Sequence, residues 1–211
     1  MSKPVRQRRP EDRPDEILDA ALAEFTEAGF AGAKVEDIAR RAGVSKGTIY
    51  LYFDTKEAML KALVEQSAGR IAQGAAALIE AGAARDPVQT YRSVFRMVLT
   101  AMSDPDISAA PRLVLSEAAR FPELARYYRE RVIQIGIGAL KRLLETGAQS
   151  GVFRKVDLVA AERVLAGPAV AHLMLSTVFA LPGDPRPDPA RLADQITDIV
   201  LYGLTPRTDR P

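Results

Sequence analysis

Residues 13–61 repeat apolar positions at intervals of three and four residues, which is the period of a helix packed on one side. The first apolar stripe predicts a helix that ends at Gly29-Phe30, where a glycine can leave the helical conformation without steric cost. Its apolar positions are Ile17, Ala20, Ala21 and Phe25.

A second apolar stripe predicts a short helix of about two turns. Gly43 follows it as a stop, because glycine adopts positive φ readily. Ser45 then suits the N-cap of the next helix, since its hydroxyl can accept from the backbone N–H of Gly47 or Thr48. The stripe consists of Val35, Ile38, Ala39 and Ala42.

Residues 45–53 predict a helix whose inner side faces its predecessor through Val44, Ile49 and Phe53. Two short helices joined by a tight turn form a helix-turn-helix, and a polar outer face with donors suits duplex DNA. An ordinary αα-hairpin stays open, since tyrosine and lysine are also common surface residues. The outer face carries Lys46, Thr48, Tyr50 and Tyr52.

The chain beyond residue 62 is predicted to be alanine-rich helix with proline and glycine breaks. Neither a strand pattern nor a repeat is found, so the fold class is all-α with about nine helices. Asp54 is expected to cap the fourth helix, and Gly167-Pro168 to interrupt or kink a later one. Later helices are expected over 87–102, 107–119, 123–148, 157–181 and 191–204.

Three parts follow along the chain: a basic arm (1–12), a helix-turn-helix domain (13–57) and a helical ligand-binding and dimerisation domain (58–211). The arm is interpreted either as a phosphate or minor-groove contact or as a solubilising tail. The cations placed before the first helix are Lys3, Arg6, Arg8, Arg9 and Arg13.

Charge alone does not point to DNA, because residues 1–60 hold ten Lys and Arg against eleven Asp and Glu. The absence of cysteine excludes disulfides, a thiolate nucleophile and a zinc finger, and fits a reducing cytoplasm. One histidine, no glycine-rich phosphate loop and no paired-carboxylate motif give no catalytic constellation, so neither an enzyme, a metal nor a cofactor is expected.

The segment Val164–Leu181 has about the minimum length for a membrane span. It contains Gly167, Pro168 and His172, and is better explained as a helix buried in a dimer interface, without a membrane. The N-terminus lacks the apolar region of a secretory signal.

Residues 13–61 as a whole resemble the DNA-binding domain of the TetR/AcrR family of one-component transcriptional regulators. The matching pieces are the helix closing at Gly29-Phe30, the sequence VEDIARRAGVSKGTIYLYF, and Lys56-Glu57 with Leu60, in ungapped spacing. The segment RLVLSEAARFPELARYYRERV is similar, to a lesser degree, to the ligand-binding domain of AefR-like members of that family.

The resemblance implies a set of DNA contacts, and the chemistry of the residues agrees. Lys46 can donate to guanine, and the methyl group of Thr48 suits that of thymine. Lys34 departs from the family, which usually has Ser or Thr there; it cannot accept the cap hydrogen bond but can reach a phosphate. The implied contacts, to which Lys34 is added, are Ser45, Lys46, Gly47, Thr48, Tyr50, Tyr52 and Lys56.

One helix-turn-helix contacts few base pairs, so a homodimer on a palindromic operator is expected. The resemblance places the interface on the last two long helices, although some of the residues named must form intrachain core. The interface candidates are Leu165, Val170, Leu173, Met174, Val178, Ile196, Ile199 and Val200.

The resemblance also implies a small-molecule pocket among the middle helices, for a ligand that the sequence does not identify. Each candidate can equally be a core residue, and His172 is expected to be buried and neutral. The candidates are Tyr91, Phe95, Met102, Phe121, Tyr128, His172 and Met174. The function expected is a repressor released from its operator by this effector; an activator and a helical protein-interaction module are the alternatives.

Overall fold

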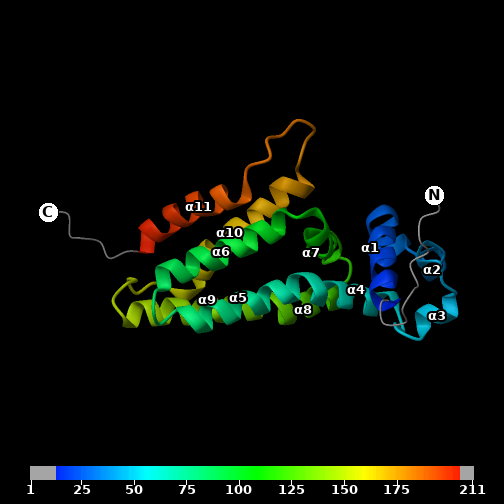
Figure 1. Ribbon diagram of the computed structural model, residues 1–211, viewed down its shortest axis with the longest axis horizontal. Helices are drawn as coiled ribbons and strands as arrows, with labels where there is room; N and C mark the ends of the chain where they lie inside the picture. The colour runs from blue at the N-terminus through cyan, green and yellow to red at the C-terminus, as the bar shows by residue number, and fades with distance from the viewer. Residues whose placement is uncertain (1–12, 205–211) are drawn as a thin grey trace, which may run out of the picture.

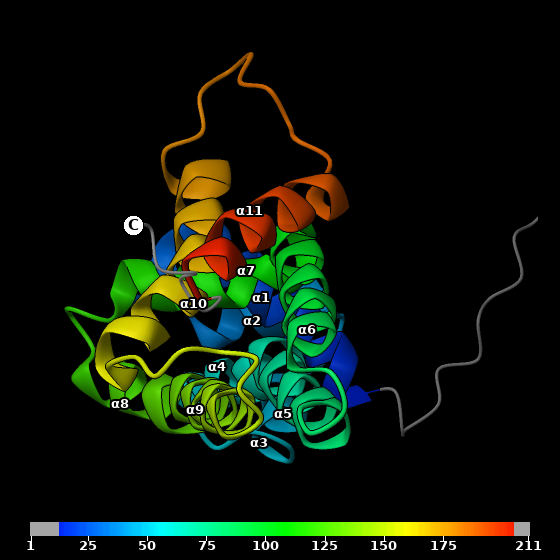
Figure 2. The same ribbon diagram turned by 90° about the vertical axis from the view of Figure 1, so that its left-hand side faces the viewer.

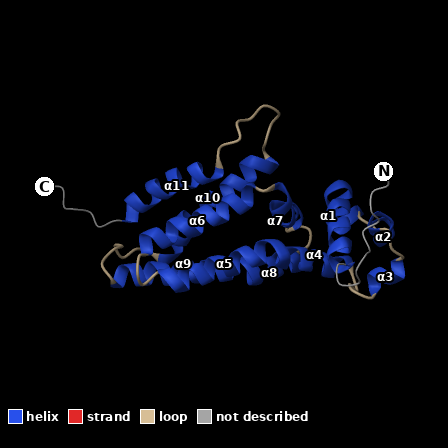
Figure 3. Cartoon of the chain, in the orientation of Figure 1, coloured by secondary structure: helices blue, strands red, loops and turns tan. Residues whose placement is uncertain are grey.

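The computed structural model describes residues 13–204, and over that range it contains helices and no strand (Figures 1 and 3). Three π-helical segments continue neighbouring α-helices, so the described chain forms nine continuous helices and confirms the predicted all-α class. The π-helical segments are Glu65–Gly69, Arg129–Ile133 and Met174–Val178. The α-helices are α1 (Arg13–Gly32), α2 (Val35–Ala42), α3 (Lys46–Tyr50), α4 (Lys56–Val64), α5 (Arg70–Gly82), α6 (Pro87–Ser103), α7 (Pro105–Glu117), α8 (Pro122–Tyr128), α9 (Gln134–Gln149), α10 (Leu158–Leu173) and α11 (Pro189–Leu204).

The helices form an elongated molecule with α1, α2 and α3 gathered at one end (Figure 1). The rod formed by α4 and α5 leads from this end into a bundle of α5, α6, α9, α10 and α11, seen end-on in Figure 2. α7 contacts both α1 and α6, and so connects the two parts. The fold therefore holds the short helices α2 and α3 at a free end of the molecule.

Local capping signals set most helix ends where the sequence predicts them. Gly43 adopts a positive φ of 66° and ends α2, whereas Gly29, with a φ of 72°, kinks α1 and the helix continues to Gly32. The carboxylate of Asp86 accepts from the backbone N–H of Gln89 at 2.9 Å at the start of α6.

Two local predictions were wrong. α4 is capped by Thr55 instead of Asp54, because the Thr55 hydroxyl lies 3.1 Å from the backbone N–H of Ala58, three residues on. α10 continues through Pro168, so the predicted interruption was wrong, while the alternative of a kink there stays a prediction. Proline removes one helical hydrogen bond, and the buried residues Leu165 and Leu173 pack on either side of it.

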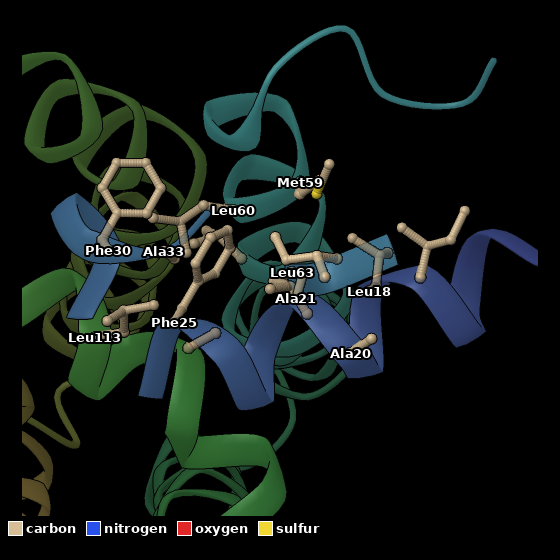
Figure 4. Close-up of a cluster of buried hydrophobic side chains, with 14 of the residues drawn as sticks. Leu18, Ala20, Ala21, Phe25, Phe30, Ala33, Met59, Leu60, Leu63 and Leu113 are labelled. Atoms are coloured by element: carbon tan, nitrogen blue, oxygen red, sulfur yellow. The ribbon is translucent and has the colours of Figure 1, made fainter. Parts of the chain in front are cut away.

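A first hydrophobic cluster joins the short helices to the rest of the chain (Figure 4). Phe25 and Phe30 from α1 pack with Leu60 and Leu63 from α4, and Leu113 reaches the same cluster from α7. α4 thus shares its core with α1 although the expected domain boundary falls at residues 57/58. A second cluster fills the space between α5, α6, α9, α10 and α11.

Candidate nucleic-acid interface

The α2–turn–α3 unit is held by backbone hydrogen bonds around a left-handed glycine. Gly43 donates its N–H to the carbonyl of Arg40 at 3.2 Å, and Val44 donates to that of Ala39 at 3.0 Å. Ile38 of α2 and Ile49 of α3 are fully buried in the first cluster. This packing fixes the angle of α3 and leaves its opposite side free.

Ser45 caps α3 as predicted, accepting from the backbone N–H of Thr48 at 3.0 Å, with the two hydroxyls 2.9 Å apart. The helix itself is shorter than the predicted span of 45–53: it covers Lys46–Tyr50, and Leu51 and Tyr52 form a turn. The N–H of Phe53 still donates to the carbonyl of Ile49 at 2.9 Å, so the turn stays packed on the helix.

The outer side of α3 is solvent-exposed. Lys46, Gly47, Tyr50 and Tyr52 are exposed, and Thr48 is half-buried beside its capping serine. Leu51 is 81% exposed, which is unusual for a leucine that an ordinary hairpin would bury. The structure therefore brings six of the eight predicted contact residues, from Ser45 to Tyr52, onto one turn-and-helix surface.

Lys46 is paired within the protein. Its ammonium donates to a carboxylate oxygen of Glu36 on α2 and lies 5.7 Å from the centre of the Tyr50 ring. The hydrogen bond from Lys46 holds the pKa of Glu36 below its usual value, and the same contact raises the pKa of Lys46. Sequence reasoning did not single out Glu36, which stands ten residues before its partner.

Lys34 is the N-terminal residue flanking α2 and gives it no side-chain cap, as its chemistry predicts. Its backbone carbonyl accepts from Asp37 and Ile38, both at 3.1 Å, so the helix still begins there. The side chain is exposed on the same unit as α3.

Lys56 has a role that sequence reasoning missed. Its ammonium donates to the carbonyls of Phe30 at 2.8 Å and Ala31 at 3.1 Å, and lies 4.9 Å from the centre of the Phe30 ring. A cation at the carboxyl end of α1 satisfies carbonyls that lack helical partners. The predicted phosphate contact would have to compete with these bonds.

The arm predicted over residues 1–12, with Lys3, Arg6, Arg8 and Arg9, lies outside the described residues. Arg13, the first described residue, donates to Glu16 at 2.8 Å.

Comparison with known proteins identifies the family of this chain. A family model described as bacterial regulatory proteins of the tetR family matches residues 17–63. A second, described as the C-terminal domain of AefR-like transcriptional repressors, matches residues 89–204. The chain belongs to the TetR family. It is a transcriptional regulator, of a family of regulators rather than enzymes.

Relatives of this TetR-family chain cover nearly its whole length. A helix-turn-helix regulator of Bacillus subtilis, YdgC, is 29% identical over 90% of this chain and 92% of its own. The fatty acid metabolism regulator protein of the same organism is 26% identical over 95% and 98%. Among solved structures, the fatty acid degradation regulator FadR from Bacillus halodurans superposes with a TM-score of 0.75, at 25% identity over 96% of this chain and 100% of that one.

The predicted pocket residues of this regulator do not gather around one space. Tyr91 and Phe95 are buried in the second cluster, where the Tyr91 hydroxyl donates to the carbonyl of Leu165 at 3.0 Å. Phe121 packs edge-on against Phe30, with ring centroids 5.0 Å apart, in the first cluster. Two hollows on the described surface, one along α6 and one between α10 and α11, are lined by residues other than the seven predicted.

Three of these residues lie outside the second cluster. Tyr128 packs against the first cluster, and burial raises its pKa to about 12. Met102 is buried at the carboxyl end of α6, whereas Met174 is half-buried after α10.

His172 is buried and hydrogen-bonded at both ring nitrogens. Its Nε2 lies 2.8 Å from the Ser103 hydroxyl, and its Nδ1 lies 3.4 Å from that of Ser176. Because the Ser103 hydroxyl donates to the carbonyl of Leu99 at 2.8 Å, its oxygen is left to accept and Nε2 carries the proton. Burial lowers the pKa of His172, which agrees with the expected neutral form.

An exposed apolar face covers α10, its π-helical extension and α11. Val170, Val178 and Ile199, three of the predicted interface residues, lie on it, with Ile199 76% exposed. Ile196 and Val200 are half-buried. Other exposed apolar residues, not named individually as interface candidates, lie on or next to these helices: Val159, Val164, Leu175, Phe179, Leu181 and Tyr202.

Leu165 and Leu173 lie in the intrachain core, the alternative that the sequence left open for the interface candidates. Both are buried within the chain, because their side of α10 packs against the neighbouring helices.

In the described chain one helical stretch, Leu158–Val178, is long and apolar enough to cross a membrane by length and composition, and 22% of its most apolar part is buried.

Proposed function

We propose that the chain is a homodimeric, sequence-specific repressor that leaves a palindromic operator when a small apolar effector binds. The observation that carries this proposal is the outer side of α3, which exposes Lys46, Tyr50 and Leu51 on a rigidly capped helix. This face combines a cation with aromatic and apolar side chains, which suits contact with the phosphates and base edges of duplex DNA. We expect the protein to act in the cytoplasm.

The DNA contacts follow from the chemistry of that surface. Lys46 and Thr48 lie in the first turn of α3, the part of a recognition helix that meets base edges in the major groove. The absence of a side chain at Gly47 permits close approach, and the hydroxyls of Tyr50 and Tyr52 can donate to phosphates. Lys34 adds a cation beside them, while Lys56 contributes by fixing the end of α1.

The dimer would form through the apolar face on α10 and α11. Val170, Val178 and Ile199 are exposed together with other apolar residues of the same helices, which favours association with a second copy. Two-fold symmetry would then place two α3 helices on successive major-groove half-sites about 34 Å apart.

The effector is proposed to present an apolar chain to the protein, with long-chain acyl-CoA as the first probe. The buried surroundings of Tyr91, Phe95 and Met102 favour apolar ligands. A relative of near full length carries the name fatty acid metabolism regulator protein. His172 would lie near such a site, since its ring is hydrogen-bonded to Ser103, the neighbour of Met102.

Fluorescence anisotropy with DNA taken from around the gene for this protein tests the proposal. We expect salt-dependent binding by the parent, and weaker binding when stearoyl-CoA is added. The matched control is free coenzyme A, which lacks the acyl chain and should leave binding unchanged. Binding that neither salt nor any acyl-CoA alters would contradict the proposal.

A further inference from the structure

Glu36 is an acidic residue on the α2–turn–α3 unit, under the influence of two lysines, Lys34 and Lys46. It lies in the first turn of α2, is exposed, and its carboxylate accepts from the ammonium of Lys46 on α3. The side chains of Glu36 and Lys46 keep 58% and 49% of their exposure, so both face solvent at the contact. The positive charge of Lys34 also attracts the carboxylate of Glu36 and, like the contact with Lys46, lowers its pKa.

A carboxylate in this place affects different DNA sequences differently. Phosphates and most base atoms in the major groove are acceptors, and they give a carboxylate no hydrogen bond. The donors are the amino groups of cytosine and adenine; each base pair carries one, and its position across the groove depends on the sequence. A duplex that binds Lys46 but places no amino group within reach of the carboxylate leaves Glu36 unpaired beside negative charge.

We infer that Glu36 is a specificity-determining residue, which holds Lys46 until a duplex offers the lysine an acceptor and the carboxylate a base amino group. This inference rests on the DNA binding proposed above. Operator DNA would give both side chains a hydrogen-bond partner at once. Other DNA would accept a hydrogen bond from Lys46 but would leave the carboxylate of Glu36 without a donor. Glu36 thus lowers the affinity for other DNA sequences more than the affinity for the operator.

Asp37 provides a matched control. It lies next to Glu36 in the same first turn and has the same charge, but its carboxylate accepts from Arg40 on its own helix at 2.6 Å. Replacing either acid by its amide removes one negative charge from the same turn. Only the change at Glu36 releases Lys46.

The test compares Glu36→Gln and Asp37→Asn on two duplexes of equal length: one selected by the parent from a random library, and one of mixed sequence. Exposed ion pairs have modest strength, so we expect Glu36→Gln to tighten binding to the mixed duplex about three- to fivefold. Binding to the selected duplex should change less than about twofold, and Asp37→Asn should leave the ratio of the two affinities unchanged.

A second comparison asks whether the effect passes through Lys46. In a Lys46→Ala background, Glu36→Gln should change binding to the mixed duplex by less than about twofold, since no lysine remains to release. Equal tightening on both duplexes, the same result from Asp37→Asn, or an undiminished effect without Lys46 would each overturn the inference. If the parent selects no duplex at all, the proposed DNA binding itself fails.

Discussion

At the residue scale, Thr48 serves the recognition helix through two separate groups. Its backbone N–H completes the Ser45 cap, while its side chain is the part available to a base. Thr48→Ala should therefore keep α3 folded and relax base preference by about 1–3 kcal/mol. Competition binding with base-substituted operator duplexes measures this, and unchanged thermal unfolding is the control. An unaltered ranking of the duplexes would show that Thr48 contacts no base.

The single histidine gives the protein a defined pH dependence of stability. Because burial lowers the pKa of His172 below 6.5, the unfolded chain binds more protons at mildly acidic pH. The contribution of neutral His172 is thus present above pH 6.5 and is lost as the pH falls to the folded-state pKa.

The variant His172→Gln, which can still hydrogen-bond to Ser103, should lose less stability over this interval than the parent. Urea unfolding at about pH 7.5 and about pH 5.5 compares them. Equal losses in the two proteins would mean that His172 does not titrate differently on folding.

Single residues were predictable from sequence where their partners are close in the chain. Ser45 and Gly43 act on atoms within a few residues, so their roles follow from residue type and spacing. Lys56 contacts carbonyls more than twenty residues away, and Glu36 meets Lys46 from another helix. Such partners are set by the packing of α1, α2 and α3, which the local sequence does not specify.

At the element scale, α2 begins at Lys34 without a side-chain N-cap. Lys34→Thr should supply a hydroxyl acceptor for the first turn and raise the free energy of unfolding by about 1 kcal/mol. Thermal or urea unfolding measures the gain, with Lys34→Ala as the control that removes the lysine and adds no acceptor. Equal stabilities of the Thr and Ala variants would exclude a capping effect.

The helices themselves were largely predicted, because prolines, glycines and capping residues mark their ends. The orientation of α10 was not. That helix is apolar on most sides, so its spacing could not tell Leu165 and Leu173, which pack inward, from Val170, which is exposed. The π-helical joins were also missed, since they reflect packing between helices and have no simple sequence signal.

At the scale of the whole molecule, the apolar face on α10 and α11 predicts self-association. Ile199→Glu puts a charge on that face at a position 76% exposed, so the chain should still fold but be monomeric at micromolar concentration. Sedimentation measures the mass, and Leu78→Glu, at an exposed leucine on α5 outside this face, is the control. A dimer that survives Ile199→Glu would place the interface elsewhere.

The central property proposed for this protein is that two copies of the chain bind DNA symmetrically through α3. Footprinting of the purified protein on DNA around its own gene tests that claim most directly. We predict two related protected half-sites, centred about one helical turn apart, that disappear as salt is raised. A single unpaired protected site, or no protection at low salt, would contradict the account.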